Sequence, residues 1–289
     1  MEIKTIFKIL KKGLYCVCAM SIITGMNGIS TLASEDSNGF LWDDHTTIAH
    51  ALGAVEEKTY LNSKEGFIKS YEEGTRLFEV DLAETSDGDW VCRHTWKQSM
   101  GQWNGDEKKV LSTEEFLSSP LYGEYTPMTL KDLLILLKDY PDAYILIDSK
   151  KYSSRDYENT VEDYSAYVEI AKQAEAEDIL PQIIPELYNE SMYTAAEAVY
   201  PFTSYIYSLW QEYSEEEIET IAEFCEQKQI PAVTLNYEFW TGEIQKIFEE
   251  RGIKVFLYTL NDFEKAQKYL QNGVSGFCTD TMNETDFEG

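Results

Sequence analysis

Short apolar runs alternate with amphipathic segments along most of the chain, from about residue 46 to residue 279. The run at 143–148 is apolar almost throughout, which is typical of a strand covered on both faces. Between the runs, apolar residues recur every three to four positions, as in a helix with one buried face. We expect strands at 46–53, 78–82, 143–148, 182–187, 204–210, 232–236, 254–259 and 276–279, and helices at 64–71, 129–141, 161–176, 191–199, 215–227, 242–250 and 262–270.

This alternation of eight strands with helical connections predicts an α/β fold of the (β/α)8 TIM-barrel type. An open doubly wound sheet is the alternative. One interruption is expected after the second strand, where Ser86-Asp87-Gly88-Asp89 is a turn signal and 90–94 can return as a hairpin strand. Residues 95–127 have no strong period, so we interpret them as an insertion above the sheet.

The first 33 residues differ in kind from the rest. Four lysines precede an uncharged run at 13–29, and Thr31-Leu32-Ala33 places small residues where a signal peptidase cleaves. We predict a signal peptide at 1–33 and a barrel domain at 34–289, with an uncleaved membrane anchor as the alternative. The protein would then be secreted or extracytoplasmic, without stable membrane association after cleavage, or held at the cell surface if the segment is retained.

The formal net charge of −28 disfavours two classes of partner. Nucleic acids and anionic membrane surfaces are both repelled by a field of this sign. Three cysteines follow the predicted signal peptide, Cys92, Cys225 and Cys278, and their odd number and wide spacing do not indicate a disulfide framework or a zinc site. We expect them to be buried as small side chains.

Acidic residues mark the candidate site. In a strand, Glu79 and Asp81 leave from the same face, while Phe78 and Val80 leave from the other. Asp148 ends the third predicted strand, and the carboxyl ends of barrel strands share one mouth. Three converging carboxylates suit one hard divalent cation, Mg²⁺ or Ca²⁺.

Two of the three histidines are expected at the same mouth. His50 ends the first predicted strand, and the hairpin brings His94 back towards the carboxylates, whereas His45 is given no role. Imidazoles there suit proton transfer, and Lys150 suits a negatively charged oxygen. Together these groups suit chemistry at a phosphodiester. Three more residues near predicted strand ends are candidates for the substrate pocket, although packing is an alternative for the aromatic ones: Glu186, Trp210 and Tyr258.

The sequence also resembles the glycerophosphodiester phosphodiesterase family, within the phospholipase C-like phosphodiesterase barrels. The resemblance spans roughly 46–282 and is carried by Ile48-Ala49-His50, Asn62-Ser63, Glu79-Val80-Asp81, Thr85-Ser86-Asp87-Gly88, His94, Thr129-Leu130 and the closing 273–280 segment. It implies that His50 and His94 are the acid and base and that Glu79, Asp81 and Asp148 hold the metal. The family usually has Glu at the third metal position, with Lys two residues on, as Lys150 is here.

Besides Asp148, two positions depart from that family. Its first histidine is normally followed by an Arg that contacts phosphate, and its second by Asp, whereas Ala51 and Thr95 stand here. We expect an exported, metal-dependent phosphodiesterase acting on a small-molecule phosphodiester. The alternatives are a phospholipase C- or D-like enzyme acting on a phospholipid head group, and a non-catalytic barrel that binds a phosphorylated or glycan ligand.

Overall fold

The structure is a computed structural model that describes residues 45–104, 109–150 and 155–287. The predicted signal peptide at 1–33 lies outside the described residues. Among the helices that are described, none is both long and apolar enough to cross a membrane.

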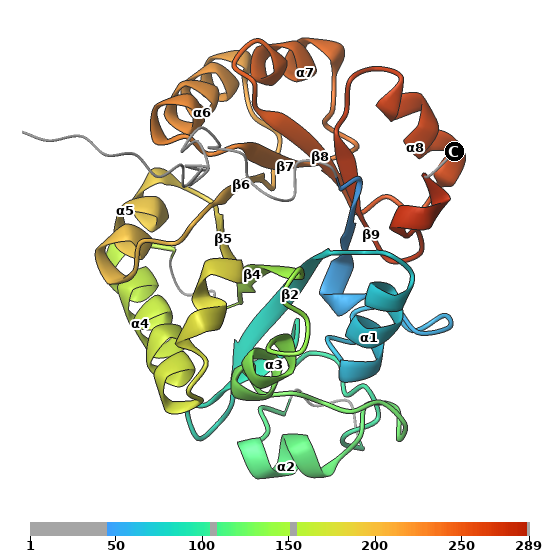
Figure 1. The fold of residues 1–289 in the computed structure, drawn as a ribbon, viewed down its shortest axis with the longest axis vertical. Coiled ribbons are helices and arrows are strands. Elements are labelled where there is room, and N and C mark those ends of the chain that lie inside the picture. Colours follow the sequence, from blue (N-terminus) through green and yellow to red (C-terminus); the bar gives the residue numbers. More distant parts are fainter. Residues whose placement is uncertain (1–44, 105–108, 151–154, 288–289) are drawn as a thin grey trace, which may run out of the picture. The chain divides into compact units, whose positions relative to one another are not determined.

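Eight parallel strands close into a barrel (Figure 1). The strand β1 pairs with both β9 and β2, so that Ile48 lies opposite Cys278 on one side and Leu77 on the other. The prediction of a (β/α)8 barrel is therefore confirmed. The barrel strands are β1 (Thr47–Ala49), β2 (Leu77–Glu84), β4 (Tyr144–Ser149), β5 (Ile183–Leu187), β6 (Ile206–Leu209), β7 (Ala232–Asn236), β8 (Lys254–Tyr258) and β9 (Gly276–Thr279).

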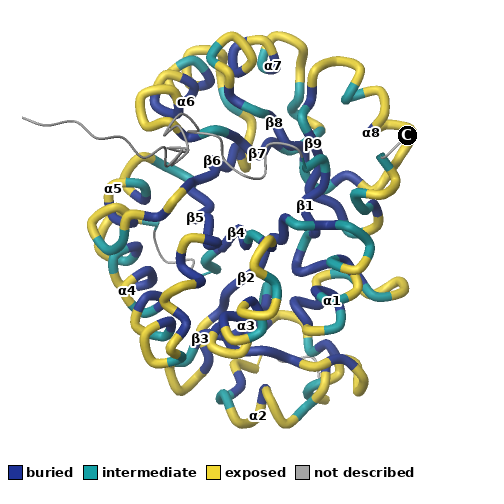
Figure 2. The backbone as a smooth tube through the Cα atoms, in the orientation of Figure 1, coloured by how far each residue is buried: buried dark blue, intermediate teal, exposed yellow. Residues whose placement is uncertain are grey.

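Helices surround the strands and bury their inner sides against them (Figure 2). All α-helices begin after a Ser, Thr, Asp or Asn whose side chain accepts a backbone N–H of the first turn, which satisfies one otherwise unpaired donor. The helices between strands are α1 (Lys64–Glu72), α3 (Leu130–Leu137), α4 (Tyr157–Gln173), α5 (Glu190–Val199), α6 (Glu215–Lys228), α7 (Gly242–Glu249) and α8 (Phe263–Leu270), and the 3₁₀ helices are η1 (His50–Leu52), η2 (Glu177–Gln182) and η3 (Glu284–Asp286).

Three predicted boundaries near the site are wrong. The first strand ends at Ala49, because Ala51 and Leu52 adopt left-handed backbone angles (φ 49° and 62°) that turn the chain into η1. The second strand continues to Glu84 instead of ending at residue 82, because β3 (Trp90–Cys92) pairs with its last residues in an antiparallel hairpin. Since β3 stops at Cys92, His94 lies in the loop that follows it.

The insertion at 95–127 has an apolar core of its own. It contains a short helix, α2 (Thr113–Ser118), that the pattern did not predict, because six residues are too few to show a helical period. Arg93 is almost fully buried at its base and donates to the carbonyl of Thr95 (2.9 Å) and the side chain of Gln102 (2.6 Å). These bonds fix the start of the loop that carries His94.

The barrel interior is filled at one level by an apolar plug with one residue from each barrel strand. The plug consists of Ile48, Leu77, Leu146, Ile184, Ile206, Ala232, Phe256 and Cys278. A larger core lies between the strands and the helices and takes the alternate residues of each strand, such as Phe78 and Val80. Cys92, Cys225 and Cys278 are free and buried, as expected.

Candidate active site

The polar groups of the site form the layer next to the plug. Side chains in a strand alternate between faces, so the residue two positions after each plug residue also points inward. In chain order, these eight residues are His50, Glu79, Asp148, Glu186, Ser208, Thr234, Tyr258 and Asp280. The period of two thus places candidates from distant parts of the sequence at one level of the barrel.

A cavity of about 250 Å³ opens above the plug, and Ile48, Leu146 and Cys278 contribute to its lining. The structure brings the predicted site residues together around it. Those that line it are His50, Glu79, His94, Asp148, Lys150, Glu186, Trp210 and Tyr258. Asp81 does not line the cavity, because it is fully buried, but its carboxylate belongs to the same cluster. His45 lies outside, 4.0 Å from Glu284.

The carboxylates of Glu79, Asp81 and Asp148 converge, with one oxygen from each lying within 4.8 Å of the others. Asp148 Oδ1 is buried and has no hydrogen-bond partner among the described residues. Asp81 Oδ1 accepts no hydrogen bond either, although Lys150 Nζ lies 2.7 Å from it. Lys150 supplies a cation for Asp81, whereas the buried Asp148 Oδ1 has no partner, so this all-oxygen donor set fits a further cation, a hard divalent ion.

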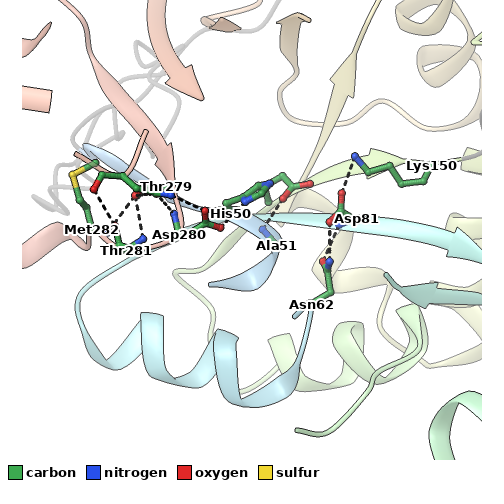
Figure 3. Close-up of polar contacts among 11 residues, drawn as sticks. His50, Ala51, Asn62, Asp81, Lys150, Thr279, Asp280, Thr281 and Met282 are labelled. Carbon is green, nitrogen blue, oxygen red and sulfur yellow. Dashed lines mark hydrogen bonds and ion pairs between the residues drawn. The ribbon is translucent and has the colours of Figure 1, made fainter. Parts of the chain in front are cut away.

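Neighbouring groups hold the carboxylates in place. The backbone N–H of Ala51 donates to Glu79 Oε2 (2.7 Å). Asn62 donates to Asp81 Oδ2 (2.7 Å) and accepts from the Asp81 N–H (3.0 Å), as Figure 3 shows. Lys150 contacts both Asp81 and Asp148. Asn62 was not among the predicted site residues, and its role here depends on a contact across 19 residues.

The pKa values of the charged groups in the cluster are shifted from their ordinary values. Burial, and then the charge of Asp81, raise the pKa of Glu79 well above its ordinary value. Burial also opposes ionisation of Asp81, but Lys150, His94 and His50 together outweigh it and the pKa of Asp81 falls. Although burial opposes the Lys150 charge, Asp148 and Asp81 raise the pKa of Lys150 well above its usual range. Lys150 is therefore a fixed cation beside the acids.

His50 is oriented by a carboxylate that the sequence did not single out. Its Nδ1 lies 2.8 Å from Asp280 Oδ1, and the Asn261 amide donates to Asp280 Oδ2 at 2.8 Å (Figure 3 shows the His50–Asp280 contact). Burial opposes ionisation of Asp280, but the bonds from His50 and Asn261 lower its pKa. An ionised Asp280 at Nδ1 leaves the other ring nitrogen available for chemistry. The sequence did offer one signal for Asp280: it stands two residues after Cys278, an inward position of the last strand.

His94 has a different environment. Burial lowers its pKa, although the negative charge of Asp81 opposes the shift. The Tyr60 ring lies edge-on to both imidazoles, with its centroid 4.6 Å from that of His50 and 4.9 Å from that of His94. Tyr60 was also missed, because it stands in a loop outside the predicted strands.

The remaining candidates line the part of the cavity wall outside the Glu79–Asp81–Asp148 cluster. Glu186 is buried, and burial followed by the charge of Asp148 raises its pKa to about 7. The Tyr258 hydroxyl donates to the carbonyl of Leu209 (3.1 Å), and Trp210 is 51% exposed at the mouth. Arg155 and Tyr188 also line this wall and had not been predicted.

The fold and this cavity define the class: a (β/α)8-barrel enzyme with acidic and imidazole groups at the carboxyl ends of its strands. The sequence model of the glycerophosphoryl diester phosphodiesterase family matches residues 56–284. The chain belongs to this family, whose members are phosphoric diester hydrolases, so the predictions of the family and of an enzyme are confirmed. Among curated proteins, none matches the sequence.

Solved structures show the same fold. A phosphodiesterase from Oleispira antarctica, in complex with the product sn-glycerol-3-phosphate, has a TM-score of 0.64 at 19% identity, covering 81% of this chain and 92% of its own. A glycerophosphodiester phosphodiesterase from Parabacteroides distasonis has a TM-score of 0.64 at 16% identity, and the match covers 82% of this chain and 93% of that one. A glycerophosphodiester phosphodiesterase from Thermotoga maritima has a TM-score of 0.57 at 22% identity, and the match covers 82% of this chain and 94% of that one.

Proposed function

We propose that this protein is a metal-dependent glycerophosphodiesterase that hydrolyses a polar glycerophosphodiester to glycerol phosphate and an alcohol. The observation that carries the proposal is the cavity in which the Glu79–Asp81–Asp148 cluster, two imidazoles and Lys150 come together. The product bound to the Oleispira antarctica enzyme agrees with a substrate of this class. The family match supports it independently.

The metal would be held by Glu79, Asp81 and Asp148. When bound, it would be Mg²⁺ or Ca²⁺ and would offset charge on the non-bridging phosphate oxygens. Lys150, already cationic, would contact a phosphate oxygen from the same side. Because these groups are fixed before the substrate arrives, little reorganisation is needed when negative charge develops.

The histidines would carry the protons. His50, paired with Asp280, takes a proton from the attacking oxygen, because the carboxylate stabilises the imidazolium that forms. His94 gives a proton to the leaving oxygen, since a lowered pKa makes its protonated form the stronger acid. The attacking oxygen bonds to phosphorus, and the bond to the head-group oxygen breaks. The attacking oxygen belongs either to water or to the neighbouring hydroxyl of the substrate. Attack by the hydroxyl would give a cyclic phosphate first.

The test is a turnover assay with glycerophosphodiesters of several head groups, in Mg²⁺, in Ca²⁺ and with a chelator, followed by ³¹P NMR. We expect glycerol phosphate only in the presence of metal. The His50→Ala and His94→Ala variants should each lose roughly 10²–10⁴-fold in kcat. His45→Ala is the control and should keep wild-type rates, because His45 lies outside the cavity. Near-normal rates in either of the first two variants would refute the assignment.

Export is a further part of the proposal. It is supported by the basic start and by the uncharged run at 13–29. The protein recovered outside the cytoplasm is expected to begin at Ser34, which amino-terminal sequencing would show. Recovery of the intact chain in the membrane fraction would support the anchor instead.

A further inference from the structure

Arg155 is a cation of the cavity wall for which the mechanism has no use. It stands just before α4, is partly buried, and lines the same cavity as the acid cluster. Its guanidinium carbon lies 3.2 Å from the centroid of the Tyr188 ring and 5.8 Å from that of Trp210. Lys150, by comparison, contacts two carboxylates. Among the residues the structure describes, no carboxylate forms a direct ion pair with Arg155, although its charge acts to lower the pKa of Glu186, which burial raises.

Arg155 contacts the ring of Tyr188, another residue that lines the cavity. Tyr188 follows Glu186 by two residues and carries Arg155 on its face. Burial, and then the charges of Asp148 and Glu186, raise the pKa of the Tyr188 hydroxyl. Trp210 is 51% exposed and Arg155 beside it is partly buried, whereas the carboxylates of the cluster are buried, so Arg155 and Trp210 lie nearer the mouth. A substrate group bound there would lie further towards the mouth than a phosphate held at the acids.

The chemistry of this wall selects against one kind of head group. A quaternary ammonium such as choline is usually bound on aromatic faces by cation–π attraction. Here the Tyr188 face already carries the guanidinium of Arg155. Arg has a planar fork of donors that matches carboxylate or phosphate oxygens, and those donors have no ionic partner in the described part of the chain.

We propose that Arg155, supported by Tyr188 and Trp210, forms a subsite for a negatively charged group on the substrate's head group. The enzyme would then prefer glycerophosphodiesters with an acidic head group to those with choline. This inference rests on the proposed function, and it adds the part of the substrate beyond the scissile phosphate. The anion contacted by Arg155 has two sources, the head group and the scissile phosphate, and the experiment separates them.

The experiment uses glycerophosphodiesters of similar size whose head groups differ in charge: 3-hydroxypropionate (anionic), 1,3-propanediol (neutral) and choline (cationic). The kcat/KM of the wild-type enzyme is expected to be at least about tenfold higher for the anionic diester than for the choline diester. Arg155→Ala should lower kcat/KM for the anionic diester by roughly 10- to 100-fold, as for loss of a charged hydrogen bond. It should change the value for the other two by less than about threefold.

Two further variants sharpen the result. Arg155→Lys keeps the charge but loses the planar fork, so it should restore only part of the preference. Lys228→Ala is the matched control, because Lys228 also lies over a tyrosine ring, Tyr193, at 5.3 Å but does not line the cavity. It should leave all three rates unchanged.

The outcomes are distinguishable. An equal loss on all three diesters in Arg155→Ala would assign Arg155 to the scissile phosphate and overturn the head-group subsite. A wild-type preference for choline would overturn it without any variant, so the test does not depend on the folding of Arg155→Ala. Hydrolysis of none of the diesters by the wild type would instead reject the proposed function itself.

Discussion

The two sides of the barrel mouth have the same backbone geometry and opposite chemistry. For β1, β2 and β4, the inward positions after the plug are His50, which directly follows β1, and Glu79 and Asp148. On β6, β7 and β8, the corresponding positions are Ser208, Thr234 and Tyr258. At these positions one side therefore holds an imidazole and two carboxyl groups, and the other holds hydroxyl groups that shape the cavity.

The difference shows what buried charge requires. The neutral side is satisfied locally, as when the Tyr258 hydroxyl donates to a neighbouring carbonyl. The charged side needs partners drawn from other elements: Lys150 for two acids, Asn62 for Asp81 and Asp280 for His50. Buried charges without such partners are costly. The comparison predicts that changes on the charged side reduce turnover far more than changes on the neutral side.

The largest effect is expected from Asp148→Asn. It removes one of three carboxylates while keeping the size of the side chain, so kcat should fall on the order of 10²–10³-fold. The rise in Tm on adding Mg²⁺ or Ca²⁺ should shrink as well, because an ion that binds the native state stabilises it. Steady-state kinetics and thermal melts check both effects. Asp163→Asn is the control, since Asp163 is a buried acid bonded to Ser149 (2.8 Å) outside the cavity.

A smaller loss is expected from Asp280→Asn. The substitution removes the negative charge at His50 Nδ1, so the ring is less well oriented and its imidazolium is less stabilised. We expect kcat to fall roughly 10- to 100-fold, at or below the low end of what acid–base catalysis contributes. KM should stay unchanged, and Asp280→Glu should recover part of the rate. An unchanged kcat would mean that Asp280 only supports the fold.

A change on the neutral side should affect binding alone. Trp210 is half-exposed at the mouth, and its ring centroid lies 5.8 Å from the guanidinium carbon of Arg155, a residue with no part in proton transfer. Trp210→Ala should raise KM about 3- to 10-fold, the size expected from an aromatic contact, with kcat unchanged. Trp210→Phe should restore most of the affinity. A large fall in kcat would contradict the division between the two sides.

The smallest effect concerns stability. Folding raises the pKa of Glu186 from 4.5 to about 7. Between pH 4.5 and pH 7, the native state therefore holds a proton on Glu186 that the unfolded state releases. Stability is therefore lost as pH rises through this window, and the cost is complete above pH 7. With a chelator present, Glu186→Gln should gain ~1–3 kcal/mol relative to the wild type on going from pH 4.5 to pH 8. Denaturant melts measure this, with exposed Glu238→Gln as control. An equal difference at both pH values would contradict the shift.

Much of the site could be predicted because strands have a period of two. Once Leu77, Leu146 and Ile48 are inward, their neighbours two residues on are inward as well. That rule needs only local sequence, and it placed Glu79 and Asp81 on one face, whereas Asp148 and His50 were predicted from their positions at strand ends. Boundaries were less predictable, since the left-handed turn at Ala51 and the β2–β3 pairing depend on contacts outside each segment.

The supporting residues could not be predicted in this way. Asp280 lies 230 residues from His50, and only the pairing of β9 with β1 brings them together. Arg155, two residues before α4, reaches Tyr188, which follows β5, and no local pattern encodes this relation.

The sequence by itself determined the alternation of strands and helices, the inward faces of the strands and the chemical types at their ends. These follow from backbone geometry within a few residues. The tertiary structure alone decided which carboxylate orients which histidine, where Lys150 binds and which cation remains without an ionic partner within the described chain. Closing the barrel sets those distances, because it joins strands that are far apart in sequence.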